Sequence, residues 1–199
     1  MRIVGVTGGV ASGKTTVAQQ FAKLGAGLLD ADRAGHEALR LPQVAAAARQ
    51  RWGEAVFGAA GRIDRARLAH IVFAPSEEGQ RERKYLEQLT HPEIARLLDR
   101  QAKALAVSGT AVAVLDAALL FEAGWHQRCE KTIFVEAPRE ARQQRVNARG
   151  WSKEEFAARE GAQESLDRKR ERADVIIDNS GPPERTQAQV EQFWASLFR

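Results

Sequence analysis

Residues 2–15 read RIVGVTGGVASGKT, and this stretch decides the fold of the chain. Its first half is apolar and β-branched and runs directly into glycines, which predicts a buried strand followed by a tight loop. Beyond the loop, apolar side chains return with the spacing of a helix, and a glycine follows the last of them. They are Val17, Ala18, Phe21 and Leu24, followed by Gly25. A strand, a glycine loop and a helix are therefore expected in that order.

The loop itself, GGVASGKT at residues 8–15, matches the pattern G-x-x-x-x-G-K-[S/T] in the strand-to-helix context that the pattern requires. Gly8 and Gly13 allow the backbone to curl so that several N–H groups face inward at a helix N-terminus and form an anion site. Lys14 can reach the β- and γ-phosphates of a nucleotide, and the Thr15 hydroxyl can bind Mg²⁺. ATP or GTP is the expected ligand. The alternative interpretation is a plain glycine turn before a helix.

Four more apolar segments are typical of strands. They are residues 25–30, 110–121, 131–137 and 173–179. The run at 110–121 lacks polar alternation, which predicts burial on both faces, as in a parallel sheet. Helical patterns separate the strands. The expected fold is therefore α/β, a P-loop doubly wound five-stranded parallel sheet flanked by helices.

The part of the chain between the second and third strands is expected to be helical. Residues 34–52 have a helical pattern with a break at Pro42, and residues 62–107 contain no good strand candidate. Asp64 is placed to cap a helix, and a long segment at 76–106 is punctuated by Pro92. This composition predicts a helical insertion in the α/β fold.

Length and composition restrict the class of protein. A chain of 199 residues with 44% hydrophobic content suits one compact unit. The lone Cys129 excludes an internal disulfide, and the apolar run at 111–121 is interrupted by Asp116, so a membrane span of ~20 residues is not available. We expect a reduced, cytoplasmic protein. The net charge of +4 suits a phosphorylated small molecule, a nucleic acid or merely a basic surface. Nucleic acid is the weakest of these, because no basic cluster is interleaved with aromatic residues.

Three carboxylates follow predicted strands. Asp116 ends an apolar strand as in a Walker B arrangement, where it can hold Mg²⁺ directly or through water. Asp30 and Asp32 stand at the carboxyl end of the second strand, outside which the ligands of open α/β sheets bind. One of this pair could orient or deprotonate an acceptor hydroxyl. Helix capping is the alternative role for each of the three.

Four arginines share one face of the helix expected after residue 138. They are Arg139, Arg142, Arg145 and Arg149, at intervals of three, three and four. Such a stripe is typical of a solvated surface, and it also suits a lid that places guanidinium groups over ATP phosphates. The four histidines show no metal-ligand spacing.

Together these residues resemble the dephospho-CoA kinase family, whose members phosphorylate the ribose 3′-hydroxyl of dephospho-coenzyme A in the last step of coenzyme A synthesis. The resemblance spans almost the whole chain. It rests on VTGGVASGKTTVA (6–18), LDAD (29–32), IDRARLAHIVF (63–73), LEQLTHPEI (86–94), LLFEAG (119–124) and ADVIIDNSG (173–181), with Arg145 and Arg149 in the lid. Four positions depart from the usual family pattern, which has Gly, Pro, Gln and an apolar residue there: Ala11, Ala118, Arg142 and Glu160.

The resemblance implies a single domain over residues 1–199 with three parts. The core would comprise about 1–61, 108–137 and 173–199, a helical substrate-binding region about 62–107, and a small helical lid about 138–172. ATP would be the co-substrate with Mg²⁺, and dephospho-coenzyme A the acceptor. We expect a monomer or small homo-oligomer without nucleic-acid or membrane partners. The alternatives are another P-loop nucleoside or nucleoside monophosphate kinase and a non-catalytic ATP-binding switch.

The family pattern also implies roles for particular residues. Asp32 would be the acceptor base, and Lys14 and Arg145 would act with it in catalysis. Thr15 and Asp116 would hold Mg²⁺, directly or through water. The implied ATP-binding residues are Gly8, Gly9, Val10, Ala11, Ser12, Gly13, Lys14, Thr15, Thr16, Arg145, Arg149 and Asn179. The implied substrate-binding residues are Asp32, His91, Pro92, Leu119 and Glu122.

Overall fold

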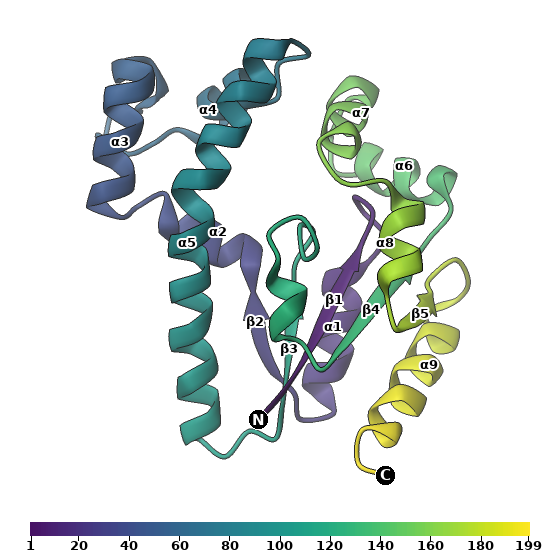
Figure 1. Ribbon diagram of the computed structural model, residues 1–199. Coiled ribbons are helices and arrows are strands. Elements are labelled where there is room, and N and C mark those ends of the chain that lie inside the picture. Colours follow the sequence, from purple (N-terminus) through teal and green to yellow (C-terminus); the bar gives the residue numbers. More distant parts are fainter. The chain divides into compact units, whose positions relative to one another are not determined.

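A computed structural model describes residues 1–199, and its centre is one parallel sheet. The strands are β1 (Arg2–Gly8), β2 (Gly27–Asp30), β3 (Val112–Asp116), β4 (Lys131–Glu136) and β5 (Val175–Asp178). Their order is β2-β3-β1-β4-β5, and every neighbouring pair is parallel (Figure 1). The predicted α/β class with five parallel strands is confirmed.

Helices make up most of the remaining chain. They are α1 (Lys14–Lys23), α2 (Ala31–Ala38), α3 (Pro42–Trp52), α4 (Arg65–Val72), α5 (Glu77–Val107), α6 (Arg139–Asn147), α7 (Lys153–Gly161), α8 (Leu166–Arg172) and α9 (Pro183–Ser196). Two short 3-10 helices are η1 (Gly53–Val56) and η2 (Trp125–Arg128). None of the helices combines the length and the apolar character that crossing a membrane requires.

The chain forms two compact units. The first comprises Met1–Ala31 with Arg100–Arg199 and contains the sheet, and the second is Asp32–Asp99. The second unit includes α3, which the sequence-based division assigned to the core. The functional roles expected for the core, the substrate region and the lid stay predictions.

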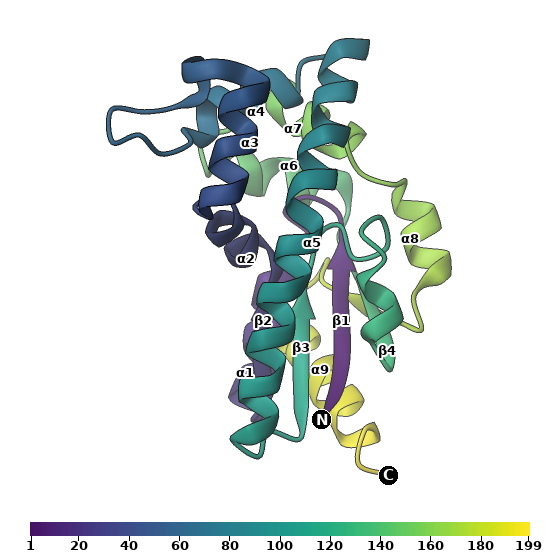
Figure 2. The ribbon, with the colours of Figure 1, turned by 60° about the vertical axis from the view of Figure 1, so that its left-hand side comes forward.

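In the first unit, the two faces of the sheet are covered by different elements. Val4 and Val6 of β1 point into a buried cluster with Phe21 of α1 and Val190 of α9, and both helices lie on this side of the sheet (Figure 2). On the opposite face, Leu120 packs directly against Gly5 of β1. A Cβ added to Gly5 would lie only 2.7 Å from a methyl carbon of Leu120. The sheet is therefore buried on both faces, as its continuous apolar strands predict.

The strand expected over residues 110–121 is shorter than predicted. β3 ends at Asp116, and residues 117–123 form turns instead. Just beyond the strand, the carbonyl oxygen of Ala118 accepts hydrogen bonds from two buried side chains, Lys169 Nζ at 2.7 Å and the Thr7 hydroxyl at 3.5 Å, which hold the turn. Leu120 stays buried in the turns. The apolar run correctly indicated burial, but it did not indicate where the strand ends.

The second unit has its own apolar core. The buried residues of this cluster are Ala48, Val56, Phe57, Leu68 and Val72. The carboxylate of Asp64 accepts the N–H groups of Ala66 and Arg67, so the predicted cap is confirmed. The expected break at Pro42 is also confirmed, because α3 begins there. Pro92, by contrast, lies inside α5. Figure 2 shows α5 as one continuous helix.

Candidate active site

The loop between β1 and α1 has the backbone curl that its glycines predict. Gly8 has a φ of 151° and Gly13 a φ of 99°, conformations that side chains rarely adopt. Space is also restricted at both positions: a Cβ at Gly8 would lie 2.5 Å from the Val135 carbonyl oxygen, and one at Gly13 would lie 2.1 Å from the Asn179 amide nitrogen. Ala11 is the one non-glycine residue with positive φ, 59°. The loop therefore requires glycine at 8 and 13 and accepts some strain at 11.

The N-terminus of α1 is suited to anions. Gly13 occupies the N-cap position, where no side chain caps the first N–H groups of the helix. Lys14 folds back over the loop, and its Nζ donates to the carbonyl oxygens of Gly8 at 3.3 Å and Gly9 at 3.0 Å. The buried hydroxyl of Ser12 has no hydrogen-bond partner. The loop thus gathers a cation, N–H groups that no side chain caps and an unsatisfied hydroxyl, which is a set that fits phosphate oxygens.

The loop meets Asp116 at the carboxyl end of the neighbouring strand. Thr15 Oγ1 donates a hydrogen bond to Asp116 Oδ2 at 2.7 Å. Asp30 ends β2 directly beside Asp116 in the sheet register. No group of three or more His, Cys, Asp or Glu side chains is arranged to hold a metal ion. A hydroxyl and a carboxylate oxygen, with waters and phosphates as the other ligands, are the kind of set that Mg²⁺ uses, so Thr15 and Asp116 fit that ion.

Side chains from α6 and from the end of β5 hold the loop from outside. Arg145 Nη1 donates to the carbonyl oxygens of Ala11 at 3.1 Å and Ser12 at 3.0 Å, and its Nη2 donates to Asn179 O at 3.1 Å. The Asn179 amide donates to Ser12 O at 2.7 Å, and its oxygen accepts from Thr186 at 3.0 Å. In this structure, therefore, both residues contact the main chain of the loop. Their contact with ATP itself stays a prediction.

The arginine stripe of α6 is neither one solvated surface nor one phosphate-facing row. Arg139 and Arg149 are exposed, whereas Arg142 is 3% exposed. Arg142 forms an ion pair with Glu160 of α7 at 2.5 Å. These two positions both depart from the family pattern, and the structure pairs them with each other. Sequence reasoning placed Arg142 in the stripe, as a surface or lid residue, and missed its pairing with Glu160. The only signal was that both positions depart from the family pattern, which did not indicate that they are partners.

The turns after β3 are fixed by a second buried cation that sequence reasoning missed. Lys169 of α8 is fully buried, and its Nζ lies 2.8 Å from Glu122 Oε1 and donates to Gln163 Oε1 at 3.0 Å. Burial lowers the pKa of Lys169, while the bond to Glu122 acts in the opposite direction. Glu122 also accepts the N–H of Glu164 at 2.9 Å. The expected role of Glu122 in substrate binding stays a prediction.

The remaining predicted substrate residues are divided between the two units. Leu119 follows β3 in the first unit. Asp32, in the first turn of α2, and His91 and Pro92, in α5, belong to the second unit. Asp32 is exposed and His91 is half-buried. Their roles toward an acceptor stay predictions.

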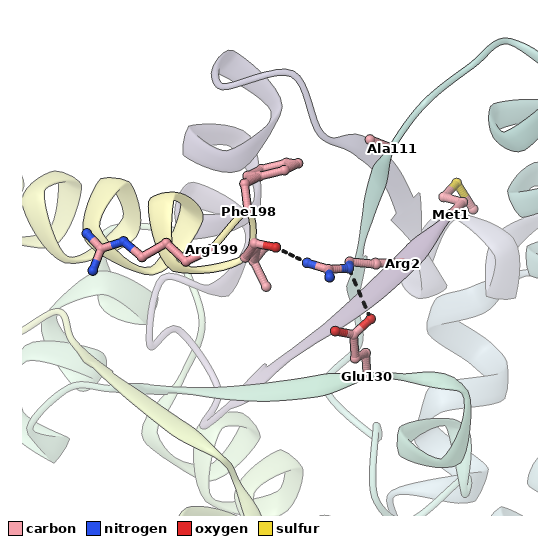
Figure 3. A pocket seen from close by; sticks show the side chains of 7 residues that line it. Met1, Arg2, Ala111, Glu130, Phe198 and Arg199 are labelled. Atoms are coloured by element: carbon pink, nitrogen blue, oxygen red, sulfur yellow. Dashed lines mark hydrogen bonds and ion pairs between the residues drawn. The ribbon is translucent and has the colours of Figure 1, made fainter.

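A surface cleft of about 490 Å³ lies at the other end of the sheet (Figure 3). It is lined by Met1, Arg2, Ala111, Glu130, Leu197, Phe198 and Arg199. Arg2 donates to the Leu197 carbonyl oxygen and lies 3.5 Å from Glu130. Arg2 begins β1, whereas the phosphate loop follows the last residue of that strand. The cleft is therefore separate from the candidate active site.

Known proteins resemble the chain over nearly its full length. The family model for dephospho-CoA kinases matches residues 2–184. A dephospho-CoA kinase of Geobacter sulfurreducens is 41% identical over 201 residues, with 100% of each chain covered. A Thermus thermophilus crystal structure superposes with a TM-score of 0.82 at 37% identity, covering 98% of this chain and 97% of that one. The dephospho-CoA kinase structure from Campylobacter jejuni has a TM-score of 0.70 at 25% identity, covering 99% and 98%.

Proposed function

Because this chain belongs to the dephospho-CoA kinase family, we propose that it transfers the γ-phosphoryl group of ATP to the ribose 3′-hydroxyl of dephospho-coenzyme A, giving coenzyme A and ADP. The family membership predicted from the sequence is confirmed. The observation that best supports the reaction in this chain is the bond from Thr15 to Asp116 beside a glycine loop at the N-terminus of α1. It would join a phosphate site to a metal site at the carboxyl ends of β1 and β3.

The loop would bind the phosphates of ATP through its main chain. Its N–H groups and the positive end of the α1 dipole favour negative charge. Lys14 would exchange its bonds to the loop carbonyl oxygens for bonds to phosphate oxygens, which carry more negative charge and are stronger acceptors. Arg145 already lies on the same loop and would add charge on the side of α6. These contacts would position the phosphoryl group and stabilise charge that develops on it in transfer.

We assign Mg²⁺ to Thr15 and Asp116. When bound there, Mg²⁺ would supply positive charge that neutralises the charge developing on the phosphate oxygens. The hydroxyl and carboxylate already lie 2.7 Å apart, so they would approach the ion together. Asp30 ends the adjacent strand in register with Asp116 and would bind waters around the ion.

The acceptor would be held by Asp32 and by residues named from the family pattern. Asp32 would orient or deprotonate the ribose hydroxyl, a role worth ~10²- to 10⁴-fold in rate. His91 and Pro92, half-way along α5, would receive the pantetheine arm, and Leu119 and Glu122 would contact the same substrate. The exposed position of Asp32 in the first turn of α2 is consistent with a group that reaches a ligand.

The direct test is ADP release in a coupled assay with Mg²⁺, offering dephospho-coenzyme A, nucleoside monophosphates and uridine as acceptors. The proposal expects turnover with dephospho-coenzyme A far above the others. Equal or faster turnover of another acceptor would contradict it. Omission of Mg²⁺ should abolish turnover.

The role of Asp32 is tested by Asp32→Asn, with Asp30→Asn as its matched control. We expect Asp32→Asn to lower kcat by at least ~10²-fold while ATP still binds. Asp30→Asn should instead raise the Mg²⁺ concentration required for half-maximal activity. Full activity in Asp32→Asn would remove this residue from the role of base.

We further propose that the protein acts in the cytoplasm as a monomer or small homo-oligomer, without a nucleic-acid partner. The single half-buried cysteine suits a reducing compartment. Sedimentation of the purified chain with and without substrates would determine its oligomeric state.

A further inference from the structure

The phosphate loop is contacted by one arginine that its expected function does not use. Arg142 of α6 is buried, and a Cβ added to Gly9 would lie 2.9 Å from its Nη1 and 3.2 Å from its Cζ. The guanidinium group therefore lies directly against the loop. Its Nη1 also donates to the Val10 carbonyl oxygen at 3.4 Å.

Other bonds hold this guanidinium group in one orientation. Its Nε donates to Ala137 O at 3.2 Å, at the junction between β4 and α6, and its Nη1 donates to Glu160 Oε1 at 2.5 Å. The buried ring of Phe156, one turn before Glu160 on α7, lies 5.6 Å from the Arg142 Cζ. The carboxylate of Glu160 thus neutralises the charge of Arg142, and two main-chain carbonyl oxygens accept hydrogen bonds from its guanidinium group.

This geometry differs from that of a phosphate ligand. An arginine that binds phosphate keeps its fork open toward the ligand, whereas Nε and Nη1 of Arg142 already donate to two protein carbonyl oxygens and to a carboxylate. Removing a partner from a buried charge pair leaves an uncompensated charge, so the pair is expected to act as a unit.

We propose that Arg142, oriented by Glu160, is a positioning residue that fixes the main chain of the phosphate loop at Gly9 and Val10 and so sets its affinity for ATP. It connects α7 to the loop through one ion pair and does not itself bind the phosphates. The inference rests on the proposed function only in taking this loop as the ATP site.

The direction in which Glu160→Gln changes the affinity for ATP distinguishes a positioning role of Arg142 from direct contact between Arg142 and phosphate. If Arg142 only positions the loop, Glu160→Gln frees the guanidinium group to move and weakens ATP binding, by roughly tenfold. If Arg142 binds phosphate itself, removing its competing carboxylate leaves ATP affinity unchanged or increases it. The experiment therefore measures the dissociation constant of ATP by titration calorimetry, together with the KM for each substrate.

Three further variants complete the design. Arg142→Gln should weaken ATP binding more than Glu160→Gln, because it leaves Glu160 near the loop with only the exposed Arg139, 3.4 Å away, as its ion-pair partner, and adding Glu160→Gln to it should restore part of the affinity. Arg142→Lys should not restore affinity, because an ammonium group cannot reproduce the fork. Glu130→Gln is the matched control: it breaks the Arg2–Glu130 pair at the opposite end of β1 and should change ATP affinity less than about twofold (Figure 3).

The outcomes separate this proposal from the assigned reaction. Weaker ATP binding in Glu160→Gln, with the KM for dephospho-coenzyme A unchanged, supports the positioning role. Unchanged or tighter ATP binding overturns it, as does a loss of thermal stability with no change in ATP affinity. Failure to phosphorylate dephospho-coenzyme A would contradict the proposed reaction alone, because ATP affinity is read without turnover.

Discussion

Replacing Gly13 by alanine should destabilise the first unit through two separable effects. The backbone φ of 99° is unfavourable for a residue with a Cβ, which costs about 1–2 kcal/mol. The new methyl carbon would also lie 2.1 Å from the Asn179 amide nitrogen. Asn179 must then move and lose its 2.7 Å bond to Ser12 O, a further loss of about 1 kcal/mol. The free energy of unfolding should therefore fall by about 2–3 kcal/mol, and Tm by roughly 5–10 °C.

Asn179→Ala provides the partner for a double-mutant cycle. Alone it should cost about 1–3 kcal/mol, because it removes the bonds to Ser12 and from Thr186. In the double variant the steric contact no longer exists and the bond to Ser12 is lost only once. The combined cost should therefore be about 1 kcal/mol smaller than the sum of the single costs.

The measurement is urea-induced unfolding followed by circular dichroism, with thermal unfolding of the same four proteins. Costs that add within about 0.5 kcal/mol would refute the reasoning, because the Gly13 and Asn179 effects would then be independent. A Gly13→Ala variant with unchanged stability would show that the loop can relax around the methyl group.

Three other predictions follow from particular residues. Hydrogen bonds from Arg51 hold the pKa of Glu82 below its usual value of 4.5. The ionised Glu82 therefore stabilises the folded protein fully above that pH, and this stabilisation is lost as the pH falls through the pKa of Glu82 in the native state. Urea unfolding should show that Glu82→Gln lowers the free energy of unfolding at pH 7 and lowers it less at pH 3. Ala11 has a φ of 59°, so the β-branched Ala11→Val should lower the free energy of unfolding by about 1–2 kcal/mol, whereas Ala11→Gly should not lower it; equal losses in the two variants would contradict this. Burial raises the pKa of Cys129 to about 12, so iodoacetamide at pH 8 should alkylate it in urea but not in the native protein, as mass spectrometry would show.

Much of the architecture could be predicted from local patterns. The strand that leads into GGVASGKT, the glycines at 8 and 13, the helix cap at Asp64 and the helix break at Pro42 depend on backbone chemistry within a few residues, and the structure confirms them. The continuous apolar strands predicted a parallel sheet because burial on both faces leaves no polar alternation. The motif order also predicted the family, which the full-length matches confirm.

The end of β3 could not be predicted in this way. The run TAVAVLDAALLF is apolar throughout, and its pattern cannot distinguish a strand from buried turns. Beyond Asp116 the turn is held by Lys169, which donates to the carbonyl oxygen of Ala118, 51 positions away in the sequence. Long-range contacts of this kind leave no local signal.

By itself, the sequence determined the parallel sheet, the position of the phosphate loop and the family, because these depend on local spacing and on motifs that need no partner. Only the tertiary structure decided which polar side chains pair. It joined Thr15 at the start of α1 to Asp116 at the end of β3, and Arg142 of α6 to Glu160 of α7. The physical reason is that the partner of a buried charge is set by chain packing: Arg142 and Arg139 share one helix face, yet packing against the loop and α7 buries the first and leaves the second exposed.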